Sequence, residues 1–76
     1  MKLTKSQIES MQEDMTADML AILMEERHMS MQDAMLMLYN SDTYSRLLDE
    51  KSGMYYQSAG YNMDCLDNEL ATGKCY

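Results

Sequence analysis

The chain has 76 residues, of which 46% are hydrophobic and 25% are charged. That balance is ordinary for a globular protein, so we expect a single helical domain over residues 1–76 rather than a disordered chain. So small a core excludes a large enclosed active-site cleft. The chain has six basic and 13 acidic residues, which gives it a net charge of −7. The cations are scattered and form no phosphate-binding face, so we expect no nucleic acid as a partner.

The sequence also bears on membranes and on the redox compartment. No apolar run is long enough for a membrane span, so we expect no contact with a membrane. Residues 1–10 begin with a positive charge but lack the apolar stretch of a signal peptide. Cys65 and Cys75 do not resemble the framework of a disulfide-dense secreted scaffold. We interpret them as reduced thiols and expect a bacterial-type, cytoplasmic protein.

The first predicted element is a long helix over residues 5–28. Thr4 with Gln7 forms a capping box at its start, and Ser6 with Glu9 forms an equally good one. Apolar residues then recur at steps of three and four, which is the spacing of one helix face. Those residues are Ile8, Met11, Met15, Met19, Ile22 and Leu23. The periodicity therefore predicts an amphipathic helix about 36 Å long.

This helix is longer than three short helices can cover, and its apolar face is broad. We therefore predict a homodimer in which two copies cover each other through an isologous interface. The predicted interface residues are Met11, Met15, Met19, Leu20, Leu23 and Met24.

Two shorter helices are predicted next. Ser30 caps one over residues 31–40, and the Asn40–Ser41 turn stops it and starts another over residues 42–50. Gly53 is the natural left-handed residue after the second of them. The side chains expected to face the core are Met31, Ala34, Met35, Leu38, Tyr44, Leu47 and Leu48. The close succession of the two helices also permits a helix-turn-helix-like pair.

The remainder of the chain supplies the fourth helix. Residues 54–57 have strand-like composition but no obvious partner, so we expect an extended connector pinned by aromatic contacts. A helix over residues 58–70 follows, capped by Ser58, and residues 71–76 form a loose tail. The expected inner face of the helix over residues 58–70 consists of Ala59, Met63, Leu66 and Leu70. The predicted fold is an all-α, small four-helix domain with a long N-terminal helix and three short ones.

Residues 28–70 carry a pattern of small, polar and aromatic residues. It reads Ser-x-x-Tyr-x-x-Leu-x-Asp, then Gly-[Leu/Met]-Tyr-x-Gln-Ser, then a helix containing Tyr. The matching positions are Ser41, Tyr44, Leu47, Asp49, Gly53, Met54, Tyr55, Gln57, Ser58 and Tyr61. In this pattern the chain resembles a family of small bacterial proteins of the domain-of-unknown-function type. The resemblance implies an accessory or antitoxin-like role, because such proteins resemble the partner genes beside toxin–antitoxin-type loci.

A polar-aromatic patch is the candidate partner-binding site. Tyr55, Tyr56, Gln57 and Tyr61 are of the types enriched at interface hot spots. On an extended connector Tyr55 and Tyr56 would point to opposite sides, so at most one of them can be core. The other interpretation is structural: Ser58 is a cap, and the tyrosines pack with their hydroxyls in water.

No metal or cofactor is expected. His28, Met29 and Met31 offer soft copper ligands in one turn, but methionine is usually adaptable core or interface filler. Cys65, Cys75 and His28 fit no structural zinc spacing.

Catalysis is also disfavoured by the sequence. It would need a nucleophile, a base and an orienting group, whereas the chain has one histidine at a helix end. Asp64, Asp67 and Glu69 are expected on the solvated outer side of the last helix. The sequence predicts no enzyme. It favours a non-enzymatic protein–protein interaction module, accessory or antitoxin-like, whose specific partner it does not name.

The alternative is a helix-turn-helix-like transcriptional or nucleic-acid-binding regulator. Its recognition helix, residues 42–50, would need basic or amide side chains on the exposed face to contact the bases. That segment offers one arginine and three acids instead.

Overall fold

The computed structural model describes residues 3–73, and within them the fold is all-α with no strand. Four α-helices and two short 3-10 helices follow one another in the chain. They are α1 (Lys5–Glu25), α2 (Met31–Tyr39), α3 (Asp42–Leu48), η1 (Glu50–Ser52), η2 (Met54–Tyr56) and α4 (Ala59–Thr72). The predicted all-α fold with a long N-terminal helix is therefore confirmed.

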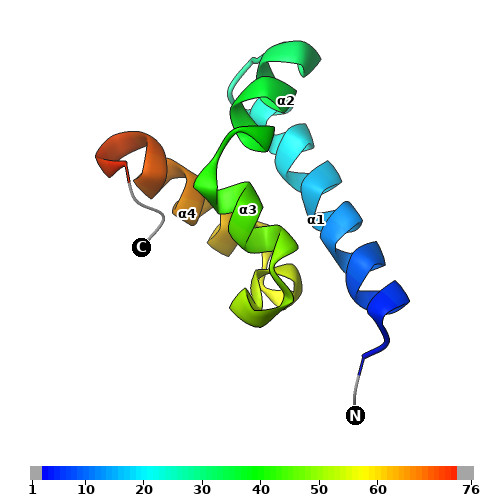
Figure 1. Ribbon diagram of the computed structural model, residues 1–76. Coiled ribbons are helices and arrows are strands. Elements are labelled where there is room, and N and C mark those ends of the chain that lie inside the picture. Colours follow the sequence, from blue (N-terminus) through cyan, green and yellow to red (C-terminus); the bar gives the residue numbers. More distant parts are fainter. Residues whose placement is uncertain (1–2, 74–76) are drawn as a thin grey trace.

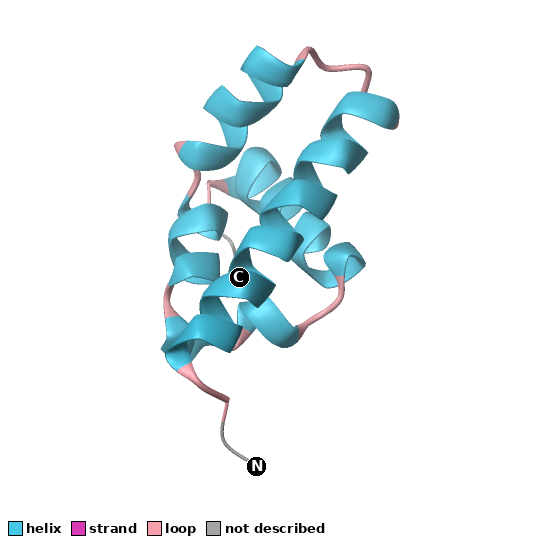
Figure 2. Ribbon diagram, turned by 90° about the vertical axis from the view of Figure 1, so that its right-hand side faces the viewer, coloured by secondary structure: helices cyan, strands magenta, loops and turns pink. Residues whose placement is uncertain are grey.

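Helix α1 organises the molecule, which measures 38 × 24 × 19 Å. It runs along one side, and α2 folds back beside its C-terminal half while α3 and α4 lie next to each other (Figure 1). Seen from that side, α1 crosses in front of the other helices (Figure 2). Its apolar face covers a single core that all four helices and η2 share. The core residues are Met15, Met19, Leu23, Ala34, Leu38, Leu47, Met54, Met63 and Leu66.

The helix starts are where the sequence predicts them, because each cap is a local interaction. Thr4 caps α1: its hydroxyl accepts the Gln7 N–H at 3.1 Å, and the Gln7 side chain accepts the Thr4 N–H at 2.8 Å. The alternative start at Ser6 is not used. The hydroxyls of Ser30, Ser41 and Ser58 accept N–H groups in the first turns of α2, α3 and α4. Each start therefore satisfies a backbone donor that would otherwise lack a partner.

Helix α1 ends at Glu25, three residues before the predicted end at His28. His28 takes a left-handed backbone conformation, with φ at 56°, and turns the chain back toward the core. The Met29 N–H then donates to the Leu23 carbonyl at 3.2 Å, and the Met29 side chain packs against the core. The chain has no glycine here, so the sequence gives no ordinary stop signal.

We expect His28→Gly to stabilise the fold. A side chain at positive φ costs about 1 kcal/mol that glycine avoids, and His28 is exposed, so little packing is lost. The melting temperature of the variant should rise by several degrees in a thermal scan followed by circular dichroism. His28→Ala is the control, because alanine keeps the strained conformation. Equal melting of both variants would show that this turn is not strained.

Other boundaries shift by one or two residues. Helix α3 stops at Leu48 because the Asp49 carboxylate accepts the Lys51 N–H at 3.0 Å and starts η1. The extended connector predicted for residues 54–57 is wrong: Gly53 takes φ 71°, and η2 follows it. Helix α4 continues to Thr72, beyond the predicted end at residue 70. The remaining tail, residues 74–76, lies outside the described residues.

Three apolar residues expected in the core are exposed. Met31, Leu48 and Leu70 lie in the first or last turn of their helices, where no neighbouring helix reaches far enough to cover them. Their periodicity is correct, but the helices they belong to are too short for every turn to be packed.

Two acids predicted on the solvated side of α4 instead bind other elements. Arg27 donates two hydrogen bonds to the Asp67 carboxylate, at 2.9 and 3.0 Å, which ties the end of α1 to α4. Glu69 accepts the N–H groups of Asp42 and Thr43, each at 2.8 Å, and the Thr43 hydroxyl at 2.7 Å. The prediction is therefore wrong for these two residues, and of the three acids only Asp64 is exposed.

Glu69 acts as a side-chain anchor for the start of α3. Burial raises the pKa of the Glu69 carboxyl, but the bonds from Thr43 and from the Asp42 N–H outweigh it and leave the pKa below its ordinary value. Thr43 itself is fully buried, so the carboxylate satisfies a hydroxyl that has no access to water.

Candidate functional site

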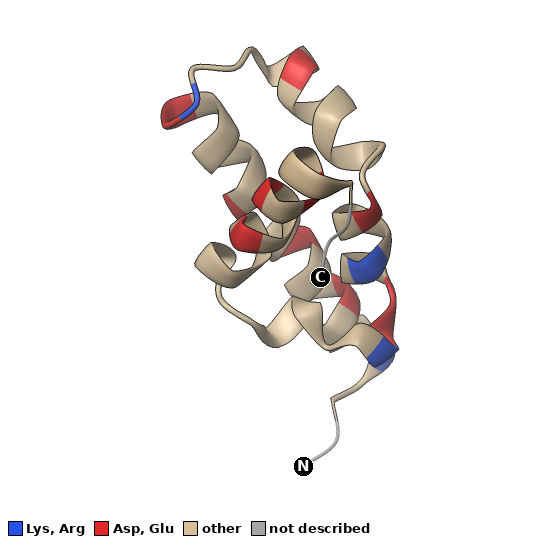
Figure 3. Ribbon diagram, turned by 90° about the vertical axis from the view of Figure 1, so that its left-hand side faces the viewer, with Lys and Arg blue, Asp and Glu red and all other residues tan. Residues whose placement is uncertain are grey.

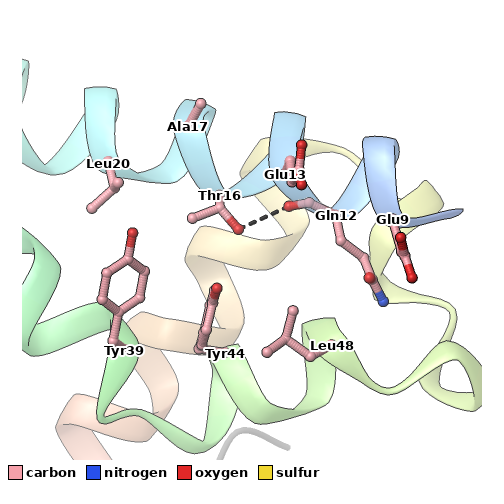
Figure 4. Close-up of a pocket in the computed structure, with 9 residues that line it drawn as sticks. All are labelled: Glu9, Gln12, Glu13, Thr16, Ala17, Leu20, Tyr39, Tyr44 and Leu48. Atoms are coloured by element: carbon pink, nitrogen blue, oxygen red, sulfur yellow. Dashed lines mark hydrogen bonds between the residues drawn. The ribbon is translucent and has the colours of Figure 1, made fainter. Parts of the chain in front are cut away.

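An open groove lies between α1 and α3, with the end of α2 at one side (Figure 4). Its volume is about 480 Å³. We call it the α1–α3 groove, and it is lined by Glu9, Gln12, Glu13, Thr16, Ala17, Leu20, Tyr39, Tyr44 and Leu48. The groove exists because α1 packs on α2, α4 and η2, whereas α3 packs mainly on α2, α4 and the 3-10 helices.

One wall of the groove is a single stripe of α1. Glu9, Glu13, Thr16 and Leu20 follow at steps of four, three and four, so their side chains project from one helix face. The Thr16 hydroxyl donates to the Gln12 carbonyl at 2.8 Å and is therefore already satisfied within the helix. The stripe changes along its length, from carboxylates near the N-terminus to an apolar side chain at Leu20.

The opposite wall is aromatic and apolar. Tyr39, at the end of α2, and Tyr44, in α3, stack at a tilt with their ring centroids 5.0 Å apart. Both side chains point toward α1 (Figure 4). Leu48 lies one helical turn beyond Tyr44 and is 49% exposed, while Tyr39 is 42% exposed. This wall therefore offers a large amount of accessible apolar surface.

Gln12 bridges the two walls at the floor of the groove. It is buried, and its amide nitrogen donates to the Leu47 carbonyl of α3 at 3.1 Å. A buried amide with a partner fixes the separation of the two helices, because leaving that amide unpaired would be costly. Gln12 was not singled out in the sequence, since its partner is 35 positions away.

The groove has an acidic end. Glu9 and Glu13 are the acidic members of the lining, and both are exposed. Acidic positions also occur on several other helices, with few basic ones among them (Figure 3). Of the basic residues, Arg46 and Lys51 lie beside a separate depression on α3 and η1.

A second apolar depression continues from the groove over α2. It is lined by Gln32, Met35, Leu36, Tyr39 and Asn40 and shares Tyr39 with the groove. Leu36 is among the most exposed large apolar side chains of the described residues. The two depressions meet at Tyr39, and exposed apolar side chains line part of each.

The predicted partner-binding residues do not converge on one pocket. Tyr55 is half-buried against the core, and Tyr56 is 61% exposed and meets it edge-on, with ring centroids 5.2 Å apart. One tyrosine packs inward and the other outward, as predicted, although on a 3-10 helix. Gln57 is exposed, and Tyr61 lines a different depression, on α4, together with Cys65. The groove, by contrast, was not predicted as a site.

The predicted dimer interface needs correction. Met15, Met19 and Leu23 lie in the core of the single chain, where α2, α4 and η2 cover them, so they are not available to a second copy. The other three predicted residues, Met11, Leu20 and Met24, are half-buried. The short helices therefore cover α1 better than its length suggests.

The metal-binding interpretations find no support in the geometry. Among residues 3–73, no three His, Cys, Asp or Glu side chains gather as a metal-binding group. His28 and Met31 are exposed, and Met29 packs against the core instead of turning toward them. Cys65 is half-buried, and Cys75 lies outside the described residues.

The helix-turn-helix-like pair is present as α2, the Asn40–Ser41 turn and α3. Helix α3 has only seven residues, and its exposed positions are Asp42, Ser45, Arg46 and Leu48. Its N-terminal turn, which would enter a DNA groove, is held by the Glu69 carboxylate.

Comparisons with protein-family models, with curated proteins and with solved structures found no match to this chain. The family resemblance therefore stays a prediction, and the function is argued from the geometry. In the part of the chain that the structure describes, no helix combines the length and hydropathy required to cross a bilayer.

Proposed function

We propose that this protein is a non-enzymatic protein–protein interaction module that binds its partner in the α1–α3 groove. The observation that carries the proposal is the groove itself: Gln12 ties its two helices together at a fixed spacing, and exposed Tyr39 and Leu48 line the space between them. Aromatic side chains positioned by rigid helices are typical binding hot spots.

The polar groups of the groove support a binding role over a catalytic one. Gln12 and Thr16 make their hydrogen bonds within the protein, so they add no reactive group to the site. The accessible chemistry is then apolar and aromatic contact with carboxylates at one end. Such a surface recognises a partner by shape and charge.

The biological setting of the proposal comes from the sequence. The resemblance to small bacterial proteins implies an accessory or antitoxin-like role, in which the groove would hold a partner protein. The interpretation of the cysteines as reduced thiols, which comes from the sequence, favours action in the cytoplasm, where thiols are kept reduced.

The proposal is tested by site-specific photo-crosslinking in the native host. A benzoylphenylalanine replaces Tyr39 in the groove or, in a matched variant, Tyr61, which is 50% exposed on α4. We expect a discrete crosslinked protein from position 39 and none from position 61. Adding Leu48→Asp should abolish the crosslink, because a charge enters the apolar wall.

The other outcomes are informative in different ways. Crosslinks from position 61 alone would move the site to the tyrosine patch and reject the groove. Crosslinks from neither position, with both variants folded by circular dichroism, would contradict an interaction module altogether.

A further inference from the structure

We propose that the occupant of the α1–α3 groove is a basic amphipathic helix of another protein. This inference rests on the proposed function and specifies the chemistry of the partner. The argument uses the length of the groove, the order of its side chains and its charge.

The length of the groove matches that of a short helix. Its α1 wall extends from Glu9 to Leu20, which corresponds to roughly 16 Å along the helix axis. About three turns of a partner helix have the same length. A groove between two helices with an apolar wall can receive an amphipathic helix, which inserts side chains spaced by three and four residues.

The side chains of the groove are ordered from acidic to apolar. Glu9 and Glu13 stand at the end beside Leu48, whereas Leu20 and Tyr39 form the other end (Figure 4). The apolar end continues over α2 to Leu36 through the shared Tyr39. A complementary helix would place lysine or arginine side chains at one end and large apolar side chains at the other.

Charge argues against a second copy as the occupant. Each chain carries a net charge of −7. An isologous contact through the groove would bring Glu9 and Glu13 of both copies to the same interface, where like charges repel. A basic partner meets attraction at the same carboxylates, and its encounter with an acidic protein is accelerated by steering.

The test uses synthetic helical peptides of 14 residues with a fluorescent label. One has leucines at helical spacing and lysines near one end, a second replaces the lysines by glutamates, and a third is a scrambled basic peptide. We expect fluorescence anisotropy to show binding of the basic amphipathic peptide alone. Its affinity should fall as salt is raised, because the carboxylates are exposed and therefore screened.

Matched variants of the full chain locate the binding. The double variant Glu9→Gln/Glu13→Gln should weaken binding about fivefold to tenfold, since each exposed ion pair contributes modestly. Its control is Asp18→Asn, because Asp18 lies on the opposite face of α1. Leu48→Ala should weaken binding about tenfold, as loss of an anchor does, while Leu70→Ala, with an equally exposed leucine on α4, should leave it unchanged.

Each contrary result has a distinct meaning. Equal binding of the acidic peptide, or equal losses in Leu48→Ala and Leu70→Ala, would overturn the inference. If position 39 still crosslinks a protein in cells while no basic peptide binds, the interaction module stands and its occupant is of another chemistry. A dimer mass in light scattering that Leu48→Ala reduces to a monomer would identify a second copy as the occupant and also overturn the inference.

Discussion

Leu66→Ala is expected to remove most of the stability of this protein. Leu66 is 0% exposed and lies in the core that the four helices share. Truncating a buried leucine typically costs about 2–5 kcal/mol, and a core of this size supplies only about 3–5 kcal/mol in total. Urea unfolding followed by circular dichroism should show a strongly lowered midpoint or no cooperative transition.

Leu70→Ala is the matched control for this prediction. Leu70 lies one turn further along the same helix, and it is 53% exposed. We expect its replacement to change stability by less than about 0.5 kcal/mol, because no core contact is lost. If the two variants unfolded at the same urea concentration, the burial of Leu66 and the exposure of Leu70 would both be in doubt.

The comparison of Leu66 with Leu70 also shows what the sequence can predict. Both leucines fall on the predicted inner face of the last helix, and the periodicity of three and four identifies that face correctly. Periodicity gives the direction of a side chain around the helix but does not say whether a neighbouring helix reaches it. Met31 and Leu48 were assigned to the core for the same reason, and both are exposed.

The helix starts could be predicted because their signals are local. A serine or threonine followed by a backbone N–H two or three positions on needs no distant partner, and all four caps are formed. The end of α1 could not be predicted in the same way. His28 adopts a conformation that glycine favours, because packing of the neighbouring Met29 against the core outweighs the local cost.

The candidate site could not be predicted because it depends on long-range polar contacts. In the sequence Gln12 resembles a surface residue of an amphipathic helix, yet its side chain is bonded to the Leu47 carbonyl and ties α1 to α3. Tyr39 and Tyr44 read as part of an apolar stripe, and only the turn between α2 and α3 brings their rings together. Composition did predict the acidity of the surface, which supplies the charge at one end of the groove.

Glu69→Gln is expected to destabilise the protein by about 2 kcal/mol at neutral pH, the range of hydrogen bonds to a charged group. Both oxygens of the Glu69 carboxylate accept, one from the Asp42 N–H and the other from the N–H and hydroxyl of Thr43. An amide keeps only one acceptor oxygen, so its NH2 group would face either the Asp42 N–H or the donors of Thr43, and at least one of these hydrogen bonds would be lost. The control is Asp64→Asn, which replaces an exposed acid on the same helix and should change stability by less than about 0.5 kcal/mol.

The contribution of Glu69 should also depend on pH in a defined direction. Its pKa in the folded protein lies below the ordinary value of 4.5, because the bonds from Thr43 and Asp42 outweigh the opposing effect of burial. A carboxyl with a lowered folded pKa stabilises the fold fully above its unfolded pKa, and that contribution is lost as the pH falls through the folded pKa. The gap in unfolding free energy between wild type and Glu69→Gln should therefore be constant from pH 7 to about pH 5 and should narrow below the ordinary pKa. A gap as wide at pH 3 as at pH 7 would mean that the ionised carboxylate is not what anchors α3. The difference between the two proteins is the quantity to follow, because all the other acidic residues are present in both.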